Sequence, residues 1–289
     1  MDSVQPAGGP TVRRLQLGAR LRLLRESKGI SRAEAGYLIR GSESKISRME
    51  LGRVSFKERD VTDLLKLYEV DDAAERDRLI ALAREANTAG WWHSYSDVLT
   101  TWFQNYLDLE QAAELIRTYE VQFVPGLLQT DAYARAVIAL GDHAGRQDVN
   151  RRAELRMARQ QVLRRPDPPR LWAVLDEAVL RRPIGGHAVH REQIESLLAA
   201  TQLGNVRLQV IPFASGGHSA VGGAFTILRF PHRDVPDVVY IEHMTSSLYL
   251  EKTEDVDHYA AAMSRLTIEA EPPERTPNLL RAVLSEFGP

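Results

Sequence analysis

Two short amphipathic segments between Ser31 and Gly52 constrain the fold of this chain more than any other feature. Ser31 and Glu34 have the S-x-x-E spacing of a capping box, which begins a helix. Ser42 is placed to cap a second helix over residues 43–50, and Gly52 is placed to end it. The pattern predicts two consecutive helices that are too short to be stable without packing against neighbours.

Each of these helices has one apolar face to bury. We expect Ala35 and Leu38 to face inward on the first helix, and Ile46 and Met49 on the second. Gly41 is expected to permit the tight turn between them. This arrangement is a helix-turn-helix, in which the second helix enters the major groove of DNA while the first crosses the backbone.

Flanking patterns complete a small helical domain. Gly29 is expected to end a preceding helix. Ser55 is expected to cap a fourth helix, and Asp71 or Asp72 a fifth. Residues 11–88 are therefore predicted to form an all-α domain of five helices.

The charge of the chain is unevenly distributed. Residues 11–70 contain 14 Lys and Arg against 8 Asp and Glu, a local charge of +6, while the whole chain has −2 and the remainder −8. Positive charge around a helix-turn-helix attracts the phosphate backbone of DNA.

The remaining composition excludes several classes of protein. The absence of cysteine excludes disulfide scaffolds, thiol nucleophiles and thiolate zinc sites. The chain contains neither a run of about 18 apolar residues nor a secretory leader, so we expect a cytoplasmic protein without membrane association.

Residues 89–289 mix helical and strand-like patterns, which predicts an α/β or α+β domain with a mixed sheet. The two strands on either side of the Gly-rich loop 214–223 are expected to form an antiparallel hairpin. Helices are expected over 108–119, 129–140, 148–165, 189–202 and 277–286, and strands over 171–175, 206–211, 224–230, 238–242 and 248–250.

Three features of this second domain have residue types found in catalytic or metal sites. His187 and His190 lack a third ligand at helical spacing. The loop around His218 is followed by a strand, where a phosphate cradle or nucleophile elbow needs a helix. Asp176 and Glu177 are adjacent, so their side chains diverge, and Glu177 is expected to begin the next helix. We therefore expect no metal, no cofactor and no catalytic centre.

Two further features allow either a surface role or a structural one. The arginine-rich helix over 148–165 could extend a DNA footprint, hold an acidic partner or form a solvated face. The turn Pro125–Leu128 could be a docking edge or part of the domain core.

The segments S-R-A-E-A-G-Y-L and S-E-S-K-I-S-R-M-E-L-G-R resemble the helix-turn-helix domain of the Xre, or lambda-repressor-like, family. The resemblance implies that Glu43, Ser44 and Arg48 face base edges, while Arg32 and Ser42 meet phosphates. The full predicted set of DNA-contacting residues is Arg32, Ser42, Glu43, Ser44, Lys45, Ser47, Arg48, Arg53 and Lys57.

Physical chemistry independently favours Arg48 and Glu43 as the specificity pair. Arginine pairs bidentately with guanine, and glutamate accepts a hydrogen bond from cytosine. Glu43 departs from the glutamine that is commoner in the family, so a contact to adenine is not expected. The alternative is that Arg48 pairs with Glu43 or Glu50 on a solvated face.

The rest of the chain resembles an actinobacterial family of antitoxin-like, Scr1-type regulators with a DUF5753 domain. The stretches that carry the resemblance are Y-E-V-Q-F-V-P-G-L-L-Q-T-D-A-Y-A-R-A from Tyr119, L-D-E-A-V-L-R-R-P-I-G-G from Leu175 and V-R-L-Q-V-I-P-F-A-S-G-G-H from Val206. This resemblance implies that the second domain binds a small protein encoded by a neighbouring gene.

Together these features predict a transcription regulator that binds double-stranded DNA as a homodimer on a pseudo-palindromic operator. Its second domain, residues 89–289, is expected to bind a small partner protein or an effector. The alternative is a DNA-targeted protein whose second domain is a small-molecule sensor or an enzyme.

Overall fold

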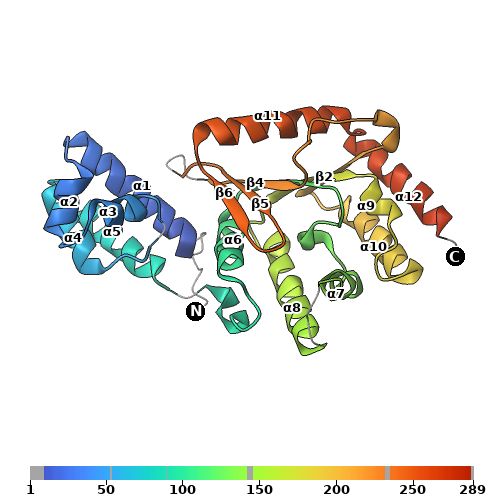
Figure 1. The fold of residues 1–289 in the computed structure, drawn as a ribbon, viewed down its shortest axis with the longest axis horizontal. Helices are drawn as coiled ribbons and strands as arrows, with labels where there is room; N and C mark the ends of the chain where they lie inside the picture. Colours follow the sequence, from blue (N-terminus) through green and yellow to red (C-terminus); the bar gives the residue numbers. More distant parts are fainter. Residues whose placement is uncertain (1–9, 53, 89, 142–145, 232–234, 288–289) are drawn as a thin grey trace. The chain divides into compact units, whose positions relative to one another are not determined.

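The computed structural model describes residues 10–52, 54–88, 90–141, 146–231 and 235–287. The chain divides into two compact units (Figure 1). The first contains the described residues of Met1–Ser94, Phe103–Ala112 and Phe230–Pro236, and the second those of Tyr95–Trp102, Ala113–Arg229 and Asp237–Pro289. A helical region followed by a region with a mixed sheet confirms the predicted fold class.

The first unit begins with five α-helices, as predicted. Gly29 after α1 adopts a φ of +67° and Gly52 after α3 a φ of +64°, so both glycines end their helices in the left-handed region. The five helices are α1 (Pro10–Ser27), α2 (Arg32–Leu38), α3 (Glu43–Glu50), α4 (Glu58–Leu67) and α5 (Ala73–Ala86).

The starts of α4 and α5 give one correction and one confirmation. Asp72 caps α5, since its Oδ1 accepts a hydrogen bond from the Ala74 N–H at 2.9 Å. Ser55 does not cap α4, which begins only after Lys57. The neighbouring Phe56 explains the delay, because its side chain is buried and its backbone exchanges two hydrogen bonds with the Asn87 amide.

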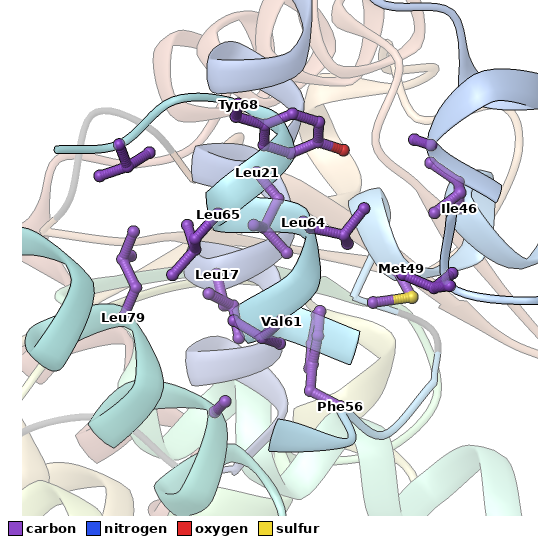
Figure 2. Packing of buried hydrophobic residues seen from close by; sticks show 14 of the residues in the cluster. Leu17, Leu21, Ile46, Met49, Phe56, Val61, Leu64, Leu65, Tyr68 and Leu79 are labelled. Atoms are coloured by element: carbon purple, nitrogen blue, oxygen red, sulfur yellow. The ribbon is translucent and has the colours of Figure 1, made fainter. Parts of the chain in front are cut away.

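One apolar core joins the five helices, and Figure 2 shows its larger side chains converging from α1, α3, α4 and α5. Two glycines let the backbones approach closely. A Cβ on Gly18 of α1 would lie 2.6 Å from the carbonyl oxygen of Glu50, and one on Gly52 would lie 2.8 Å from the nitrogen of Leu15. The end of α3 is therefore held directly against the backbone of α1.

The aromatic segment that follows contains the 3-10 helix η1 (Trp91–Tyr95) and helix α6 (Thr101–Ala112). Within the first unit, Trp92 Nε1 donates a hydrogen bond to Asp108 Oδ1 at 2.8 Å. Asp108 is fully buried, so this bond offsets part of the cost of removing its carboxylate from water.

The second unit is built on a six-stranded sheet with the order β3-β2-β1-β4-β5-β6. Strands β3, β2 and β1 run parallel, whereas β1, β4, β5 and β6 pair antiparallel. β1 is therefore the strand at which the parallel half meets the antiparallel half. The strands are β1 (Leu115–Glu120), β2 (Arg170–Asp176), β3 (Val206–Ile211), β4 (Phe225–Arg229), β5 (Val238–Glu242) and β6 (Ser247–Leu250).

Two predictions about this sheet were wrong. The helix expected over 108–119 ends at Ala112, and residues 115–120 form β1, because pairing with β2 and β4 on both sides overrides local propensity. The hairpin expected across the Gly-rich loop does not form, because β2 and β1 lie between β3 and β4.

Helices cover both faces of the sheet (Figure 1). α11, which the sequence analysis did not predict, lies along one face, where Met263 and Leu266 pack with Ile227 and Val239. α8 lies on the opposite side. The helices of this unit are α7 (Asp131–Ala139), α8 (Arg146–Arg159), α9 (Ala178–Arg181), α10 (His187–Ala200), α11 (Thr253–Glu269) and α12 (Thr276–Glu286), with 3-10 turns η2 (Gly126–Leu128), η3 (Gln160–Arg164), η4 (Phe213–Ser215) and η5 (Pro273–Arg275).

The close approach of α1 and α3 gives a first prediction. Gly18→Ala should lower the free energy of unfolding by about 1–3 kcal/mol, because the added methyl group meets rigid backbone. Gly204→Ala is the matched control, since a Cβ there has open space, and it should be neutral. Urea unfolding of both variants measures the difference, and equal stabilities would contradict the predicted contact.

Candidate nucleic-acid interface

Two serines begin the helices of the candidate interface. Ser31 forms the complete capping box with α2: its Oγ accepts the Glu34 N–H at 3.2 Å, and Glu34 Oε2 accepts the Ser31 N–H at 2.8 Å. Ser42 Oγ accepts the Lys45 N–H at 3.2 Å and caps α3. Both predicted helix starts are confirmed.

The turn between α2 and α3 depends on Arg40 and Gly36. Arg40 adopts the left-handed φ of +52°, and the Gly41 N–H donates to the Gly36 carbonyl oxygen at 2.8 Å, which completes a Schellman motif. Gly41 was expected to permit this tight turn, and the residue with the left-handed φ is its neighbour Arg40. Gly36 is needed for another reason, because a Cβ there would lie 2.9 Å from the backbone of Ser42.

The inner face of α3 is confirmed and that of α2 is corrected. Ile46 and Met49 are each 1 % exposed, and Ala35 of α2 is fully buried. Leu38, expected inside, is 44 % exposed, and Ile39 enters the core in its place. The chain leaves helical geometry at this point, so the periodicity that placed Leu38 inside no longer applies.

A buried carboxylate fastens α3 to both preceding helices. Glu50, the last residue of α3, has a side chain that is 2 % exposed. Arg25 of α1 donates to both of its oxygens, from Nε at 2.5 Å and Nη2 at 3.2 Å, and Arg32 of α2 donates from Nε at 2.9 Å. The hydrogen bond with Glu50 is the main reason why the pKa of Arg25 lies above its ordinary value.

A second ion pair fastens the start of α3 to α4. Lys45 Nζ lies 2.5 Å from Asp60 Oδ2, and the Asp60 side chain is mostly buried. Arg32 and Lys45, two of the predicted phosphate contacts, thus form intramolecular ion pairs that orient α3. Their contacts with DNA remain predictions.

The outer face of α3 is polar and open. Ser42, Glu43, Ser44 and Arg48 are exposed, and Ser47 is half-buried. Arg48 does not depend on Glu50 for a partner, since its Nε donates to the Ser44 carbonyl oxygen at 3.3 Å while Glu50 is bound by Arg25 and Arg32. The base-edge residues therefore occupy the side of α3 that the protein leaves uncovered.

Two predicted contacts lie beyond α3. Lys57 is exposed just before α4, which suits a contact with the DNA backbone. Arg53 lies outside the described residues. The assignment of both to DNA remains a prediction.

The sequence analysis missed the residues that orient the interface, which are Arg25, Glu50 and Asp60. One signal was available for Glu50, which follows Ile46 by one helical turn and so lies on the buried face of α3. A charged residue at such a position implies a buried partner. Nothing local identifies Arg25 or Asp60, because they come from other helices.

Among the features of the second unit, the histidine pair has a structural role. His190 is fully buried, and its Nε2 lies 2.9 Å from the Leu180 carbonyl oxygen. Both His187 and His190 pack edge-on against the ring of Phe287. Burial lowers the pKa of His190, which favours the neutral ring.

The Gly-rich loop and the acidic pair meet at one place in the fold. His218 Nε2 lies 2.9 Å from Tyr119 Oη and 3.5 Å from Asp176 Oδ2. Glu177 directly precedes α9 (Ala178–Arg181), as expected, while Asp176 Oδ1 accepts the Ala178 N–H at 2.8 Å. The hydroxyl of Ser219 is directed to Ala262 and Glu269, so these groups do not form a nucleophile–base pair.

Two family models match the chain. Residues 16–79 match a model described as a helix-turn-helix domain, and residues 103–282 match one described as a domain of unknown function (DUF5753). The chain belongs to the DUF5753 family. No curated protein and no solved structure matches it. In this DUF5753 protein, α2 and α3 are the two helices of the helix-turn-helix domain.

No group of three or more His, Cys, Asp or Glu side chains in the described ranges is arranged to hold a metal ion. Within the same ranges, none of the helices has the length and apolarity needed to span a bilayer.

The buried ion-pair cluster gives a second prediction. Glu50→Gln should lower the free energy of unfolding by about 3 kcal/mol, because it leaves the buried Arg25 without its counter-charge. Glu58→Gln removes a carboxylate from the exposed pair with Arg84 and should leave the free energy of unfolding nearly unchanged, because solvent screens that pair. Urea denaturation measures both, and a Glu50 variant as stable as its control would contradict the role of the cluster.

Proposed function

We propose that this DUF5753 protein is a sequence-specific transcription regulator that binds double-stranded DNA through α3. The proposal rests on one observation. The polar residues Glu43, Ser44 and Arg48 are exposed along α3, while Ile46, Met49 and Glu50 hold its other side in the protein. A helix locked on one face and open on the other can enter a major groove without rearrangement.

The electrostatics of this region support the same function. Residues 11–70 have a local charge of +6 in a chain with a net charge of −2. Arg48 suits a guanine, and Glu43 suits a cytosine amino group and repels a misplaced phosphate. Lys57 supplies charge without reading sequence.

We further propose that the protein binds as a homodimer of the Xre type. A single helix-turn-helix buries little surface and binds weakly on its own. Two copies related by a two-fold axis would read half-sites about 34–36 Å apart on a pseudo-palindromic operator. The site of action is the cytoplasm, where bacterial DNA is accessible.

For the second unit we propose regulation by binding, without catalysis. Its resemblance to the antitoxin-like, Scr1-type regulators of actinobacteria supports a small protein encoded by a neighbouring gene as the partner. An effector molecule is the other candidate. A sensor or enzyme targeted to DNA by the helix-turn-helix is the alternative to a regulator with a protein partner.

A pair of substitutions tests the DNA-binding proposal. Arg48→Ala should weaken binding to the operator by about 1–3 kcal/mol and relax the preference at one base pair. Lys57→Ala should weaken binding to all sequences alike and reduce the slope of log K against log salt by about 1. Fluorescence anisotropy with operator and scrambled duplexes at several salt concentrations measures both effects.

Arg78→Ala on α5 is the control, because Arg78 is an exposed cation on a helix that forms no part of the helix-turn-helix. It should leave affinity and specificity unchanged. Equal losses for Arg48→Ala and Lys57→Ala on operator and scrambled DNA would contradict the assignment of α3 as the reading helix. The absence of any sequence-specific binding would contradict the regulator proposal itself.

A further inference from the structure

A row of side chains crosses the α11 face of the sheet, near the amino ends of the parallel strands. Arg207 of β3, Trp172 of β2 and Arg117 of β1 occupy adjacent register positions, and Ile227 of β4 continues the row. Ile227 is fully buried in the core with α11, whereas Arg117 and Trp172 are half-buried and Arg207 is exposed. The cover that α11 provides therefore ends at β1. We call Arg207, Trp172 and Arg117 the arginine row.

The guanidinium group of Arg117 is partly enclosed and has no counter-charge bound to it. Its Nε and Nη2 are covered by protein, and within the described part of the chain neither atom has a hydrogen-bond partner. The side chain forms no ion pair with the described residues either, and Nη1 is the nitrogen that reaches the surface. Arginine stays charged in proteins, so enclosing its guanidinium group without an anion costs stability.

The acid Asp237 attracts Arg117 but is bound by another arginine. Arg229 of β4 donates to Asp237 Oδ2 from Nη2 at 2.9 Å and from Nε at 3.1 Å. Burial lowers the pKa of Arg117, and repulsion from Arg229 lowers it further than Asp237 can offset. The surrounding charges therefore leave Arg117 without an anion of its own.

Arg207 is held with its hydrogen-bond donors available. Its guanidinium carbon lies 4.8 Å from the centroid of the Trp172 ring. The ring is fixed in turn, because Trp172 Nε1 donates to Gln209 Oε1 at 2.7 Å. Gln209 Nε2 donates to the carbonyl oxygens of Thr267 and Glu271 at 3.1 and 3.0 Å. A guanidinium group that lies over a ring keeps its in-plane N–H groups for an anion.

Arg170 adds a further cation to this face. It lies two residues before Trp172 on β2, so it shares the face of the arginine row, and it is exposed. Among the described residues, no acid forms an ion pair with Arg117, Arg170 or Arg207. The face therefore presents three guanidinium groups that are complementary to a partner with several negative charges.

We propose that the arginine row binds an acidic segment of a protein partner. Carboxylates of the segment accept hydrogen bonds from Nη1 of Arg117 and from the guanidinium group of Arg207. That group of Arg207 lies over Trp172, on the strand next to Arg117. Alternate side chains of an extended segment lie on one side and are about 7 Å apart, so two acids separated by one residue suit this pair.

Charge favours a protein segment over a nucleic acid at this face. The residues outside 11–70 have a net charge of −8, which repels a polyanionic duplex, whereas a segment with a few carboxylates needs only the local arginines. The inference rests on the proposed regulation of the second unit by a protein partner, and it names the chemistry of the segment by which that partner docks.

The stability of an Arg117 variant tests whether this residue is kept for binding. Arg117→Met should raise the Tm of the full chain by about 2–4 °C, because it removes an enclosed charge without a partner and leaves an apolar side chain beside Ile227. Arg281→Met on α12 is the matched control, since Arg281 is exposed, and it should leave Tm unchanged. Differential scanning calorimetry measures both. A lower Tm for Arg117→Met would show a structural role and overturn the inference.

A peptide-binding experiment tests the acidic segment directly. The probe is a fluorescein-labelled peptide of alternating Glu and Ala, and the matched peptide has Gln in place of Glu. Fluorescence anisotropy with the full chain should show binding of the Glu peptide that weakens as salt rises, and at least 10-fold weaker binding of the Gln peptide.

Variants of the arginine row locate the binding. Arg117→Met and Arg207→Gln should each weaken binding of the Glu peptide about 10-fold, because each removes a charge-assisted hydrogen bond. Arg182→Gln and Arg281→Gln remove the same charge at exposed positions outside the strands, and they should bind the peptide as the unchanged chain does.

Three results of the binding experiments would overturn the inference. The first is equal binding of the Glu and Gln peptides, and the second is equal binding of the Glu peptide by the row variants and their controls. The third is loss of random-sequence duplex binding in the row variants, which would make the row a nucleic-acid surface. Operator binding is measured separately. Its absence in a chain that still binds the Glu peptide would contradict the regulator proposal and leave the docking site standing.

Discussion

The buried carboxylate of Glu50 is the interaction on which the DNA-binding unit depends. It receives hydrogen bonds from Arg25 of α1 and Arg32 of α2, so one side chain joins the first three helices. Such a cluster adds little net stability compared with an apolar core, because each charge loses its hydration. Its effect here is orientational: directional bonds set how α3 lies against its neighbours. The outer face of α3 then points away from the protein as a consequence of what lies behind it.

Side-chain amides hold part of the second unit in a comparable way. Gln160 donates to the carbonyl oxygens of Gly126 and Gln129, and Gln129 Nε2 donates to the Val124 carbonyl oxygen. The turn Pro125–Leu128 is therefore fixed by hydrogen bonds from side chains, and its two leucines are buried. In both units, polar side chains orient backbone that the apolar core alone leaves undirected.

Local chemistry explains which elements were predictable. The bounds of α3, β3 and β5 matched their expected ranges, because caps and apolar runs within a few residues define them. β1 was mistaken for the end of a helix, since its polar residues interrupt the alternation of a strand and its identity depends on pairing with β2 and β4. The order of the strands in the sheet could not be predicted from the sequence either. A Gly-rich loop permits a hairpin between β3 and β4. In the sheet, however, β4 pairs with β1, and β3 pairs with β2.

By itself, the sequence determined the helix-turn-helix and its outward polar residues, because capping bonds and helical periodicity act within a single turn. Only the tertiary structure decided that Arg32 and Lys45 bind Glu50 and Asp60, and that Arg40 forms the turn. The physical reason is distance along the chain. A partner from another element becomes a neighbour only when the core has packed, so no local sequence pattern predicts that contact.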